Sequence, residues 1–382
     1  MTAPLDPVLL ARDLIRKPSV TPADAGAMDV LQRALEGLGF ACRRMRFGEV
    51  ENLYARRGAA GPNLCFAGHT DVVPPGDPEA WSAAPFDAAV EDGVLVGRGA
   101  VDMKGAIAAW TAAVARVGEI PGSLSFLITG DEEGVALDGT KKVVAALIEE
   151  GEKVDHCLVG EPSSVQRLGD VIKVGRRGSL NVWLTVTGRQ GHVAYPERAA
   201  NPIPVLAKLL DRLNSRVLDD GYPAFPPSNL EITTIDVGNP ATNVIPATAR
   251  GRFNIRFNPS WTGAALMAWI EEEVAAVQAA ADGCAIAVEF LHSGDAFLTE
   301  HGPFVDLVLD TVEETAGVRP EPNTKGGTSD ARFIRSLCPV VEFGLVGQTM
   351  HQVDERVPVE EIERLTEIYA ALIRRYFARF SG

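Results

Sequence analysis

Cysteine and long apolar runs are both scarce in this chain of 382 residues, and each shortage excludes a class of protein. The five cysteines are odd in number and far apart, so they indicate neither a disulfide framework nor a thiolate zinc knuckle. They are typical of reduced, mostly buried thiols in a cytoplasmic protein. No apolar run reaches the roughly 18 residues that span a bilayer, and the N-terminal stretch lacks the apolar core of a signal peptide. We therefore expect a soluble, cytoplasmic protein with no membrane partner.

Positive charge is also in short supply. The chain has 36 Lys and Arg against 51 Asp and Glu, which gives a formal net charge of −15 at pH 7. Nucleic acids and anionic membranes bind clustered positive charge, so neither is an expected partner. The contents of hydrophobic residues (46%) and charged residues (23%) are those of an ordinary globular protein, and the length favours two domains.

Strand and helix patterns divide the chain into three stretches. Over residues 1–178, short apolar runs alternate with helical stretches, which is typical of an α/β domain with helices on both faces of a mostly parallel sheet. Residues 179–292 change to a β-β-α pattern, which predicts a smaller inserted α+β domain. The first pattern returns over residues 293–382, so we expect the chain to leave the first domain, build the second and come back.

The periodicities place individual elements in both domains. The strands expected in the α/β domain are Asn63–Gly68, Leu124–Gly130, His156–Gly160 and Pro339–Phe343. Its expected helices are Asp6–Arg16, Ala27–Leu38, Gly105–Val117, Thr140–Glu150, Pro303–Ala316 and Val359–Phe380. The inserted domain is expected to hold strands at Ser179–Gly188, Leu230–Val237, Ala249–Phe257 and Ala285–Leu291, and helices at Ile203–Leu218 and Thr262–Ala281.

His69 stands out among the six histidines because of its neighbours. It follows an apolar run, and Asp71 stands two residues on. Residues i and i+2 of an extended segment face the same side, so Asp71 can accept the second ring N–H of His69 and orient a metal-binding imidazole. Alone this is a weak motif, since a single histidine is usually structural or solvated. We interpret His156, His292 and His301 as structural or solvated histidines of this kind.

Acidic side chains follow further apolar runs. Asp102 lies in the loop before an Ala-rich helix, where it either bridges two cations or caps that helix. Glu132 and Glu133 come directly after a strand-like run. They belong either to a solvated turn or to a group of like charges that a cation relieves.

Two more candidates complete the set. Glu161 follows another apolar run, and the proline after it favours an extended glutamate that points off the strand end. His351 follows the last apolar run. Ligands bind at the carboxyl edge of an open α/β sheet, so these side chains are expected to converge there. Two histidines and three carboxylates suit two zinc ions that share a carboxylate. The expected metal ligands are His69, Asp102, Glu133, Glu161 and His351.

Other chemistries have little support in the sequence. There is no G-x-S-x-G nucleophile elbow, no G-x-x-x-x-G-K-[ST] phosphate loop and no G-x-G-x-x-G after a strand. No cysteine stands in an electropositive setting at a helix start.

Together these motifs resemble the dizinc aminoacyl amidohydrolase and exopeptidase family over essentially the whole chain. The matching segments are Gly68-His69-Thr70-Asp71-Val72-Val73-Pro74, Gly97-Arg98-Gly99 with Lys104-Gly105, Gly130-Asp131-Glu132-Glu133-Gly134, Gly160-Glu161-Pro162, Gly191-His192, Gly326–Phe333 and His351. The resemblance implies a zinc-peptidase-like catalytic domain and an inserted dimerisation domain. It also implies two Zn²⁺ ions, for which Co²⁺ can substitute.

The resemblance also implies a role for each site residue. Asp102 would bridge the two zincs, with His69 and Glu161 completing one site and Glu133 and His351 the other. Asp71 would orient His69. Glu132 would take a proton from the attacking water and deliver it to the leaving amine. His192 would polarise the scissile carbonyl in the partner subunit's active site, so a homodimer through the inserted domain is expected.

Other segments narrow the resemblance to one branch of the family. They are Val73–Asp77, Trp81-Ser82, Pro85-Phe86, Gly175–Leu180 and Thr242–Pro246. The activity they imply is hydrolysis of N-succinyl-LL-2,6-diaminopimelate in bacterial lysine and diaminopimelate synthesis. Gly347 departs from the asparagine that many members of this branch carry there. The alternatives are deacetylation of acetylornithine or another N-acyl amino acid on the same scaffold, and, more distantly, a non-catalytic binding protein.

A substrate rich in carboxylates needs a cationic clamp. Guanidinium groups pair with carboxylates bidentately, so arginines near the domain junction are candidates, although most such arginines are surface residues. The remaining candidates are weaker, and Tyr195 can equally be a packed aromatic. The expected substrate-binding residues are Arg176, Arg256, Asn243, Tyr195, Gly327 and Thr328.

Overall fold

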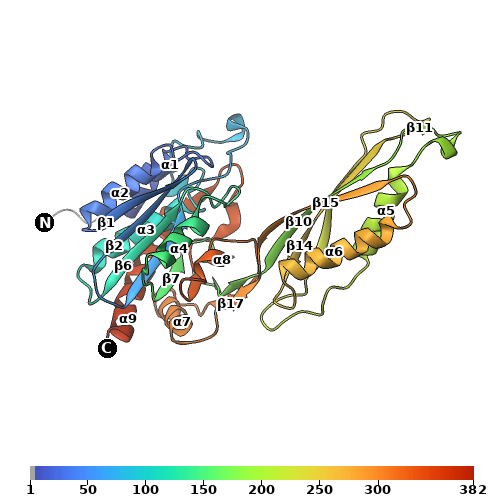
Figure 1. Cartoon of the computed structure of the whole chain (residues 1–382). Helices are drawn as coiled ribbons and strands as arrows, with labels where there is room; N and C mark the ends of the chain where they lie inside the picture. Colours follow the sequence, from blue (N-terminus) through green and yellow to red (C-terminus); the bar gives the residue numbers. More distant parts are fainter. Residues whose placement is uncertain (1–4) are drawn as a thin grey trace. The chain divides into compact units, whose positions relative to one another are not determined.

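A computed structural model describes residues 5–382, which form two compact units (Figure 1). The first unit holds the described residues up to Gly175 together with Thr299–Asn323 and Ser329–Gly382. The second unit holds Arg176–Leu298 and the short segment Thr324–Thr328. The chain therefore enters the second unit twice.

The first unit is built on an eight-stranded sheet of order β1-β2-β6-β3-β7-β18-β8-β17. The strand bounds are β1 Ala41–Phe47, β2 Val50–Arg57, β3 Asn63–His69, β6 Ser123–Thr129, β7 His156–Val159, β8 Val171–Lys173, β17 Glu321–Asn323 and β18 Val340–Glu342. The four central strands β6, β3, β7 and β18 run parallel. β3 and β6 are buried at every position, as expected of a parallel sheet covered on both faces. The mostly parallel sheet is thus confirmed.

The hairpin β1–β2 was not predicted from the sequence. Its strands pair antiparallel, and β2 also runs antiparallel to β6. β1 lies at the sheet edge and has only one buried residue, Met45, among arginines at 43, 44 and 46. The apolar signal of an edge strand is therefore weak, because only one face needs to be covered.

Seven α-helices accompany this sheet in the described part of the first unit. They are α1 Pro7–Ile15, α2 Ala27–Gly37, α3 Lys104–Val117, α4 Thr140–Glu149, α7 Pro303–Ala316, α8 Ala331–Ile334 and α9 Val359–Phe380. All but the four-residue α8 were predicted, with ends that differ by one residue at most. α3 is buried throughout Lys104–Val114 and contacts α1 and α9.

Aromatic packing joins the central helix to the sheet. The ring of Phe66 in β3 stacks on that of Trp110 in α3, with centroids 4.9 Å apart. Trp110 in turn meets Tyr369 of α9 edge-on at 5.1 Å. Such contacts fix the depth of α3 against the sheet, and α3 begins immediately after the loop that carries Asp102.

Three short strands form a separate small sheet near the end of the chain. β19 (Arg356–Pro358) pairs with β5 (Val94–Val96), and β5 pairs with β4 (Ala89–Glu91). This pairing brings the segment that follows His351 beside the segment that precedes Asp102.

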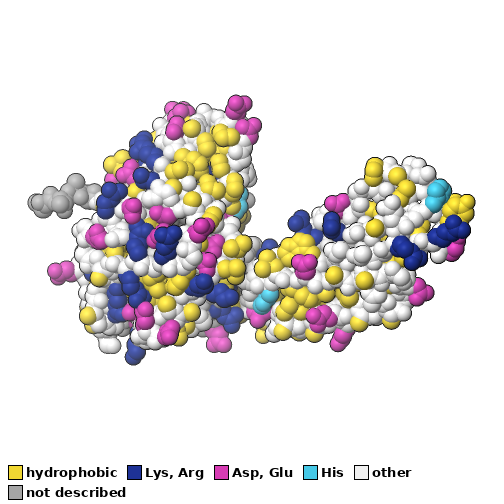
Figure 2. All heavy atoms as spheres, turned by 45° about the horizontal axis from the view of Figure 1, so that its top comes forward, with side chains coloured by type: hydrophobic (Ala, Val, Ile, Leu, Met, Phe, Trp, Pro, Cys, Tyr) yellow, Lys and Arg dark blue, Asp and Glu magenta, His cyan; other side chains and the backbone are white. Residues whose placement is uncertain are grey.

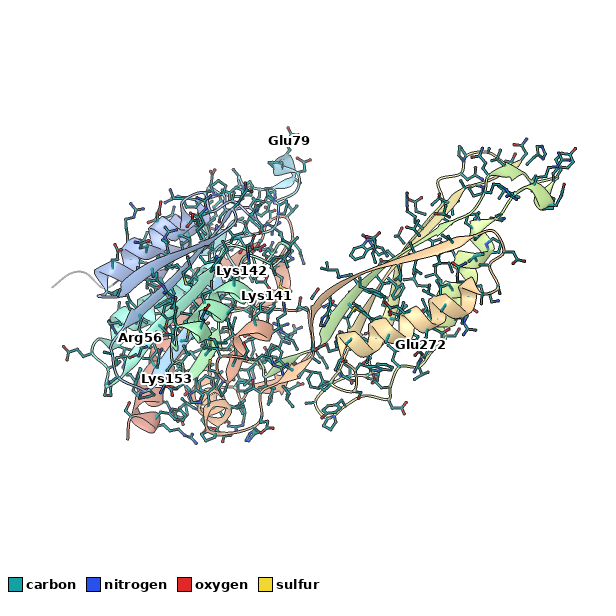
Figure 3. All side chains as sticks on the ribbon, in the orientation of Figure 1. Arg56, Glu79, Lys141, Lys142, Lys153 and Glu272 are labelled. Atoms are coloured by element: carbon teal, nitrogen blue, oxygen red, sulfur yellow. The ribbon has the colours of Figure 1, made fainter. Side chains whose placement is uncertain are left out.

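The second unit is an antiparallel sheet of order β12-β14-β10-β15 with helices α5 and α6. The bounds are β10 Gly178–Thr187, β12 Asn229–Asp236, β14 Thr248–Phe257, β15 Ala285–Gly294, α5 Pro202–Asn214 and α6 Gly263–Gln278. Alternate residues of β10 are buried against the helices, whereas Glu272 of α6 is exposed and points outward (Figure 3). The expected alternation of strands is confirmed here.

Charges of both signs are interspersed on the face of the described chain seen in Figure 2, with no single basic patch in that view. Within residues 5–382, no helix has both the length and the apolar content that a bilayer crossing needs.

Candidate metal centre

The parallel strands deliver the candidate ligands to one edge of the sheet. His69 is the last residue of β3, Glu132 and Glu133 come soon after β6, and Glu161 comes soon after β7. In the register of the sheet, Ala67 pairs with Val159 and His69 pairs with Thr129. Because neighbouring parallel strands end at the same edge, side chains from distant parts of the sequence meet there.

Asp102 lies between the two histidines. Its Oδ1 is 3.2 Å from Nε2 of His69, and its Oδ2 is 3.3 Å from Nε2 of His351. The two imidazoles therefore face opposite oxygens of one carboxylate, which is the geometry of a bridging ligand. α3 has Met103 at its N-cap position and no side-chain cap, so Asp102 is not a helix cap.

Each imidazole has a further carboxylate beside it. Glu161 Oε1 lies 3.6 Å from His69 Nε2, and Glu133 Oε1 lies 2.9 Å from His351 Nε2. Ligand atoms of His69, Glu132 and Glu161 also lie within 4.8 Å of one another. The side chain of His69 is 1% exposed and that of His351 is 46% exposed, so the two donor sets differ in access to water.

The carboxylates gathered around the two imidazoles favour positive charge at this site. Burial by itself lowers the pKa of His69, but the hydrogen bond to Asp102 and the charge of Glu161 outweigh it and raise that pKa well above 6.5. Hydrogen bonds to Asp102 and Glu133 raise the pKa of His351 to about 10. Burial works to raise the pKa of Asp102, yet its bonds to the two imidazoles lower it.

A divalent cation would supply such positive charge. It would replace the imidazole protons and offset the charge of the gathered carboxylates. Imidazole nitrogen together with carboxylate oxygen is a donor set that zinc accepts, with room for other divalent metals. The residues therefore fit a two-metal centre.

Asp71 holds the site by a route that differs from the expected one. Nδ1 of His69 lies 2.9 Å from the main-chain oxygen of Asp71, whereas the nearest carboxylate oxygen is 3.7 Å away. The ring N–H therefore goes to the carbonyl, and Nε2 is left as the ligand nitrogen. The Asp71 carboxylate instead accepts hydrogen bonds from the N–H groups of Glu132 (3.2 Å) and Glu133 (3.1 Å) and from the hydroxyl of Thr21 (2.5 Å).

The first two acids after β6, Asp131 and Glu132, have different surroundings. Asp131 is buried and accepts main-chain N–H groups of Ala136, Leu137 and Asp138, so it shapes the turn. Glu132 is partly buried, and its pKa is raised well above 4.5, first by burial and then by the charge of Glu161. A carboxyl group whose pKa is raised holds a proton more readily than an exposed glutamate, which suits a role in acid–base chemistry.

Arg98 and Glu355 support the site and were not predicted to do so. Glu355 accepts hydrogen bonds from the N–H groups of Val101 (2.9 Å) and Asp102 (3.1 Å), and Arg98 Nη1 donates to its second oxygen at 2.7 Å. Arg98 belongs to the segment Gly97-Arg98-Gly99, on which the family resemblance partly rests. The local sequence does not predict that its ion-pair partner lies 257 positions away.

The second unit gathers three of the other expected residues. His192 lies in β11 (Gly191–His192), which pairs with β13 (Val244–Ile245). Asn243 precedes β13, and its carbonyl accepts the N–H of Val193 at 3.0 Å. The rings of His192 and Tyr195 are 5.7 Å apart, and both residues are exposed, so Tyr195 is not a packed core aromatic.

The remaining candidates also lie in the second unit. Arg176 is buried in the short strand β9 (Gly175–Arg176), and its Nη1 donates to the carbonyl of Gly327 at 3.2 Å. Thr328 follows Gly327 in the chain. Arg256 lies in β14, paired in register with Ser179 of β10.

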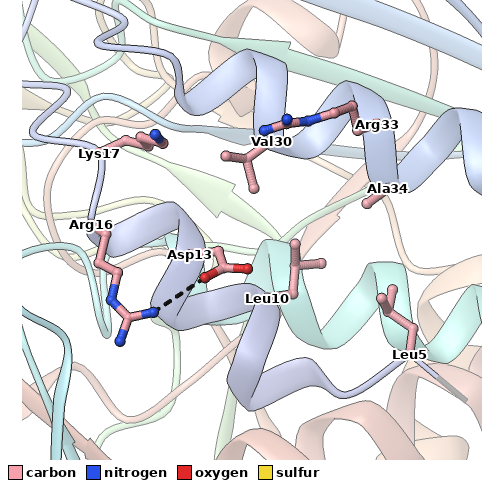
Figure 4. A pocket seen from close by; sticks show the side chains of 8 residues that line it. All are labelled: Leu5, Leu10, Asp13, Arg16, Lys17, Val30, Arg33 and Ala34. Carbon is pink, nitrogen blue, oxygen red and sulfur yellow. Dashed lines mark hydrogen bonds and ion pairs between the residues drawn. The ribbon is translucent and has the colours of Figure 1, made fainter. Parts of the chain in front are cut away.

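A groove of about 540 Å³ between α1 and α2 contains none of the candidate residues (Figure 4). It is lined by Leu5, Leu10, Asp13, Arg16, Lys17, Val30, Arg33 and Ala34. Arg16 pairs there with Asp13 at 3.3 Å, and both side chains are exposed. Exposed pairs of this kind contribute little binding energy.

Comparison with known proteins identifies close relatives along the whole chain. Succinyl-diaminopimelate desuccinylase of Caulobacter vibrioides (strain NA1000 / CB15N) is 69% identical over 377 residues, which cover 99% of this chain and 97% of the relative. The protein of the same name from Phenylobacterium zucineum (strain HLK1) is 66% identical over 383 residues, covering 99% and 100%.

Solved structures share the fold. An M20 family metallo-carboxypeptidase from Sulfolobus solfataricus matches with a TM-score of 0.81 at 16% identity, covering 98% of this chain and 99% of that one. A dinuclear metal-binding M20 peptidase from Bacillus subtilis matches with a TM-score of 0.72 at 16% identity, covering 97% and 98%. The model of peptidase family M20/M25/M40 matches residues 65–375, and this chain belongs to that family.

Proposed function

We propose that this chain is a metal-dependent amide hydrolase that cleaves N-succinyl-LL-2,6-diaminopimelate to succinate and LL-2,6-diaminopimelate. The observation that carries the chemistry is Asp102, whose two oxygens lie within 3.3 Å of two different imidazoles. The observation that carries the substrate is the 69% identity to a succinyl-diaminopimelate desuccinylase over nearly the whole chain. The reaction belongs to bacterial lysine and diaminopimelate synthesis, and we place it in the cytoplasm.

Two zinc ions are the metals we propose, with Co²⁺ as a substitute. His69 and Glu161 would hold one ion, Glu133 and His351 the other, and Asp102 would bind both. When bound, such ions lower the pKa of a coordinated water and stabilise negative charge on the carbonyl oxygen.

Glu132 is the residue we propose for proton transfer. Its carboxylate accepts a proton from the attacking water and passes that proton to the amide nitrogen as the carbon–nitrogen bond breaks. The amine then leaves neutral, and the carboxylate is regenerated. The Asp71 bonds to the N–H groups of Glu132 and Glu133 hold the main chain from which both glutamates project.

His192 is the residue we propose to polarise the scissile carbonyl. Its Nδ1 accepts the N–H of Ala194 at 3.1 Å, so the proton of the neutral ring resides on Nε2. Nε2–H is then a ready donor for the carbonyl oxygen as it gains negative charge. We propose that His192 acts in the active site of a partner subunit, in a homodimer formed through residues 179–292.

The succinyl and amino-acid carboxylates of the substrate need cationic partners. We propose Arg176 and Arg256 for this role, because guanidinium groups bind carboxylates bidentately. Weaker polar contacts are assigned to Asn243, Tyr195, Gly327 and Thr328.

Turnover by the zinc-loaded protein tests the proposal. The rate of release of diaminopimelate from its N-succinyl derivative is compared with the rate of release of ornithine from N-acetylornithine. We expect kcat/KM to favour the succinylated substrate by at least about tenfold. Preference for the acetylated substrate would assign a deacetylase, and failure to cleave either substrate with zinc bound would assign a binding protein.

A further inference from the structure

Arg98 links three segments of the first unit. It is 2% exposed, and its Nη1 donates to Glu355 at 2.7 Å and to the carbonyl of Gln352 at 3.2 Å. Its Nη2 donates to the carbonyls of His351 at 3.3 Å and Pro74 at 3.5 Å. One guanidinium group thus satisfies carbonyls of two segments that carry candidate site residues, which a fork of five N–H donors permits and a single ammonium does not.

Glu355 is the matching anion and is fully buried. One of its oxygens accepts the N–H groups of Val101 and Asp102, and the other accepts Arg98. The main chain of the bridging aspartate is therefore tied to the same ion pair that holds the main chain of His351.

The backbone of His351 needs such support. Its φ is +62°, in the left-handed region that residues with a Cβ seldom adopt. A residue persists in this region when the surrounding contacts over-determine it. The bond from Arg98 to the His351 carbonyl is one such contact. By contrast, His69 ends a buried strand and bonds its own neighbour Asp71, so it does not depend on the ion pair.

We propose that Arg98 and Glu355 are positioning residues that set the distance between Asp102 and His351, and thereby build the second of the two metal sites. The inference rests on the proposed dinuclear function. It assigns the two metal sites different origins, because one is set by the sheet and the other by a buried ion pair.

Metal binding to the full-length protein tests this assignment. Zinc is titrated by calorimetry into metal-free wild type, Arg98→Lys and Glu355→Gln, and the metal retained after dialysis is counted. Lysine keeps the charge of Arg98 but loses the fork. Glutamine keeps an acceptor for the Val101 and Asp102 N–H groups but turns its NH₂ toward Arg98. Circular dichroism verifies that each variant folds. If Arg98→Lys does not fold, Glu355→Gln alone tests the proposal.

Arg56→Lys is the matched control. Arg56, labelled in Figure 3, makes an ion pair with Glu152 in the same unit, and both side chains are partly buried. We expect wild type and Arg56→Lys to bind two ions. We expect the Arg98 and Glu355 variants to bind the ion at His351 at least about tenfold more weakly, and the ion at His69 with a clearly smaller loss, because Asp102 would bind both ions.

The outcomes separate this inference from the proposed function. Two unchanged affinities in either folded variant would overturn the positioning role, whatever the enzyme hydrolyses. Equal weakening of both ions would also overturn it, because a general structural defect would explain that result. Two zinc ions bound by wild type without cleavage of the succinylated substrate would overturn the proposed function and leave the positioning role intact.

Discussion

The carboxylate of Asp71 accepts a 3.1 Å hydrogen bond from the main-chain N–H of Glu133. It also accepts the N–H of Glu132, so one buried side chain holds the turn that presents both glutamates. The Asp71 carboxylate accepts three hydrogen bonds in all, from Thr21, Glu132 and Glu133. Its main role is therefore to hold the turn that carries the two glutamates, and not to orient His69.

Replacing Asp71 tests this role. Asp71→Asn keeps one acceptor oxygen but loses the other, so the turn at Glu132 loosens. We expect kcat to fall by about 10- to 100-fold, as for other residues that orient metal ligands. Thr21→Val is the control, since it removes only the hydroxyl that donates to the same carboxylate. An Asp71→Asn enzyme with wild-type kcat and metal content would contradict this assignment.

Removal of the proposed proton carrier should separate turnover from metal binding. In Glu132→Ala, we expect kcat to fall by about 10²- to 10⁴-fold while the zinc content stays near two per chain. Steady-state kinetics and metal analysis of the same sample give both values. Substantial loss of zinc would mean that Glu132, which lies within 4.8 Å of the ligand atoms of His69 and Glu161, is itself a ligand.

His192 should affect catalysis alone. For His192→Ala we expect kcat to fall by about 10²- to 10³-fold, with zinc content unchanged, because a donor to the developing oxyanion is lost. His192→Gln, which keeps an N–H donor, should recover part of the rate. Equal rates for wild type and His192→Ala would remove this residue from the mechanism.

Zinc binding should release protons. The pKa of His351 is raised to about 10, so its ring carries a proton in the metal-free protein at pH 7, and the pKa of His69 is shifted in the same direction. A zinc ligand must be neutral, so the His351 site releases about one proton for each zinc ion bound, and its apparent affinity rises with pH up to about 10. Calorimetry in buffers of different ionisation enthalpy counts these protons.

The stability of the metal-free protein depends on pH in the opposite direction to its zinc affinity. A pKa raised from 6.5 to about 10 contributes stability to the metal-free fold that is fully present below pH 6.5 and is lost as the pH rises through 10. Unfolding by urea between pH 6.5 and 10 would therefore give a falling free energy of unfolding. A rise over this range, or release of no protons on zinc binding, would contradict the charge state assigned to His351.

Gly347 offers a test of substrate contact. A Cβ built there would lie 3.4 Å from the carbonyl oxygen of Pro162 and 3.5 Å from the sulfur of Met350, so a side chain fits. We expect Gly347→Asn to change the free energy of unfolding by no more than about 0.5 kcal/mol and to lower KM for the succinylated substrate by about fivefold through one added hydrogen bond. Gly347→Ala is the control for the backbone, and an unchanged KM in the asparagine variant would show that no substrate group lies within its reach.

Much of the fold follows from local patterns in the sequence. Buried parallel strands appear as short apolar runs, and their carboxyl ends predict where ligands gather. That is why the convergence of His69, Glu133 and Glu161 was accessible from the sequence. The edge strand β1 was not accessible, because its outward arginines interrupt the apolar signal.

The supporting residues of the site depend on tertiary contacts instead. Arg98 and Glu355 are 257 positions apart, and the sign of a charge does not identify its partner in an acidic protein. Nδ1 of His69 lies 2.9 Å from the carbonyl oxygen of Asp71 and 3.7 Å from its carboxylate. Which of the two oxygens accepts the ring N–H therefore depends on a difference of less than 1 Å. No spacing rule resolves that difference.

The unequal exposure of the two imidazoles has a consequence for how ions exchange. A cation beside His69 would sit behind side chains that are almost closed to water, whereas one beside His351 would lie next to a ring that is 46% exposed. A chelator should therefore strip the pair one at a time and empty the outer position first. In a cell short of zinc, the singly loaded enzyme would then be the form that accumulates.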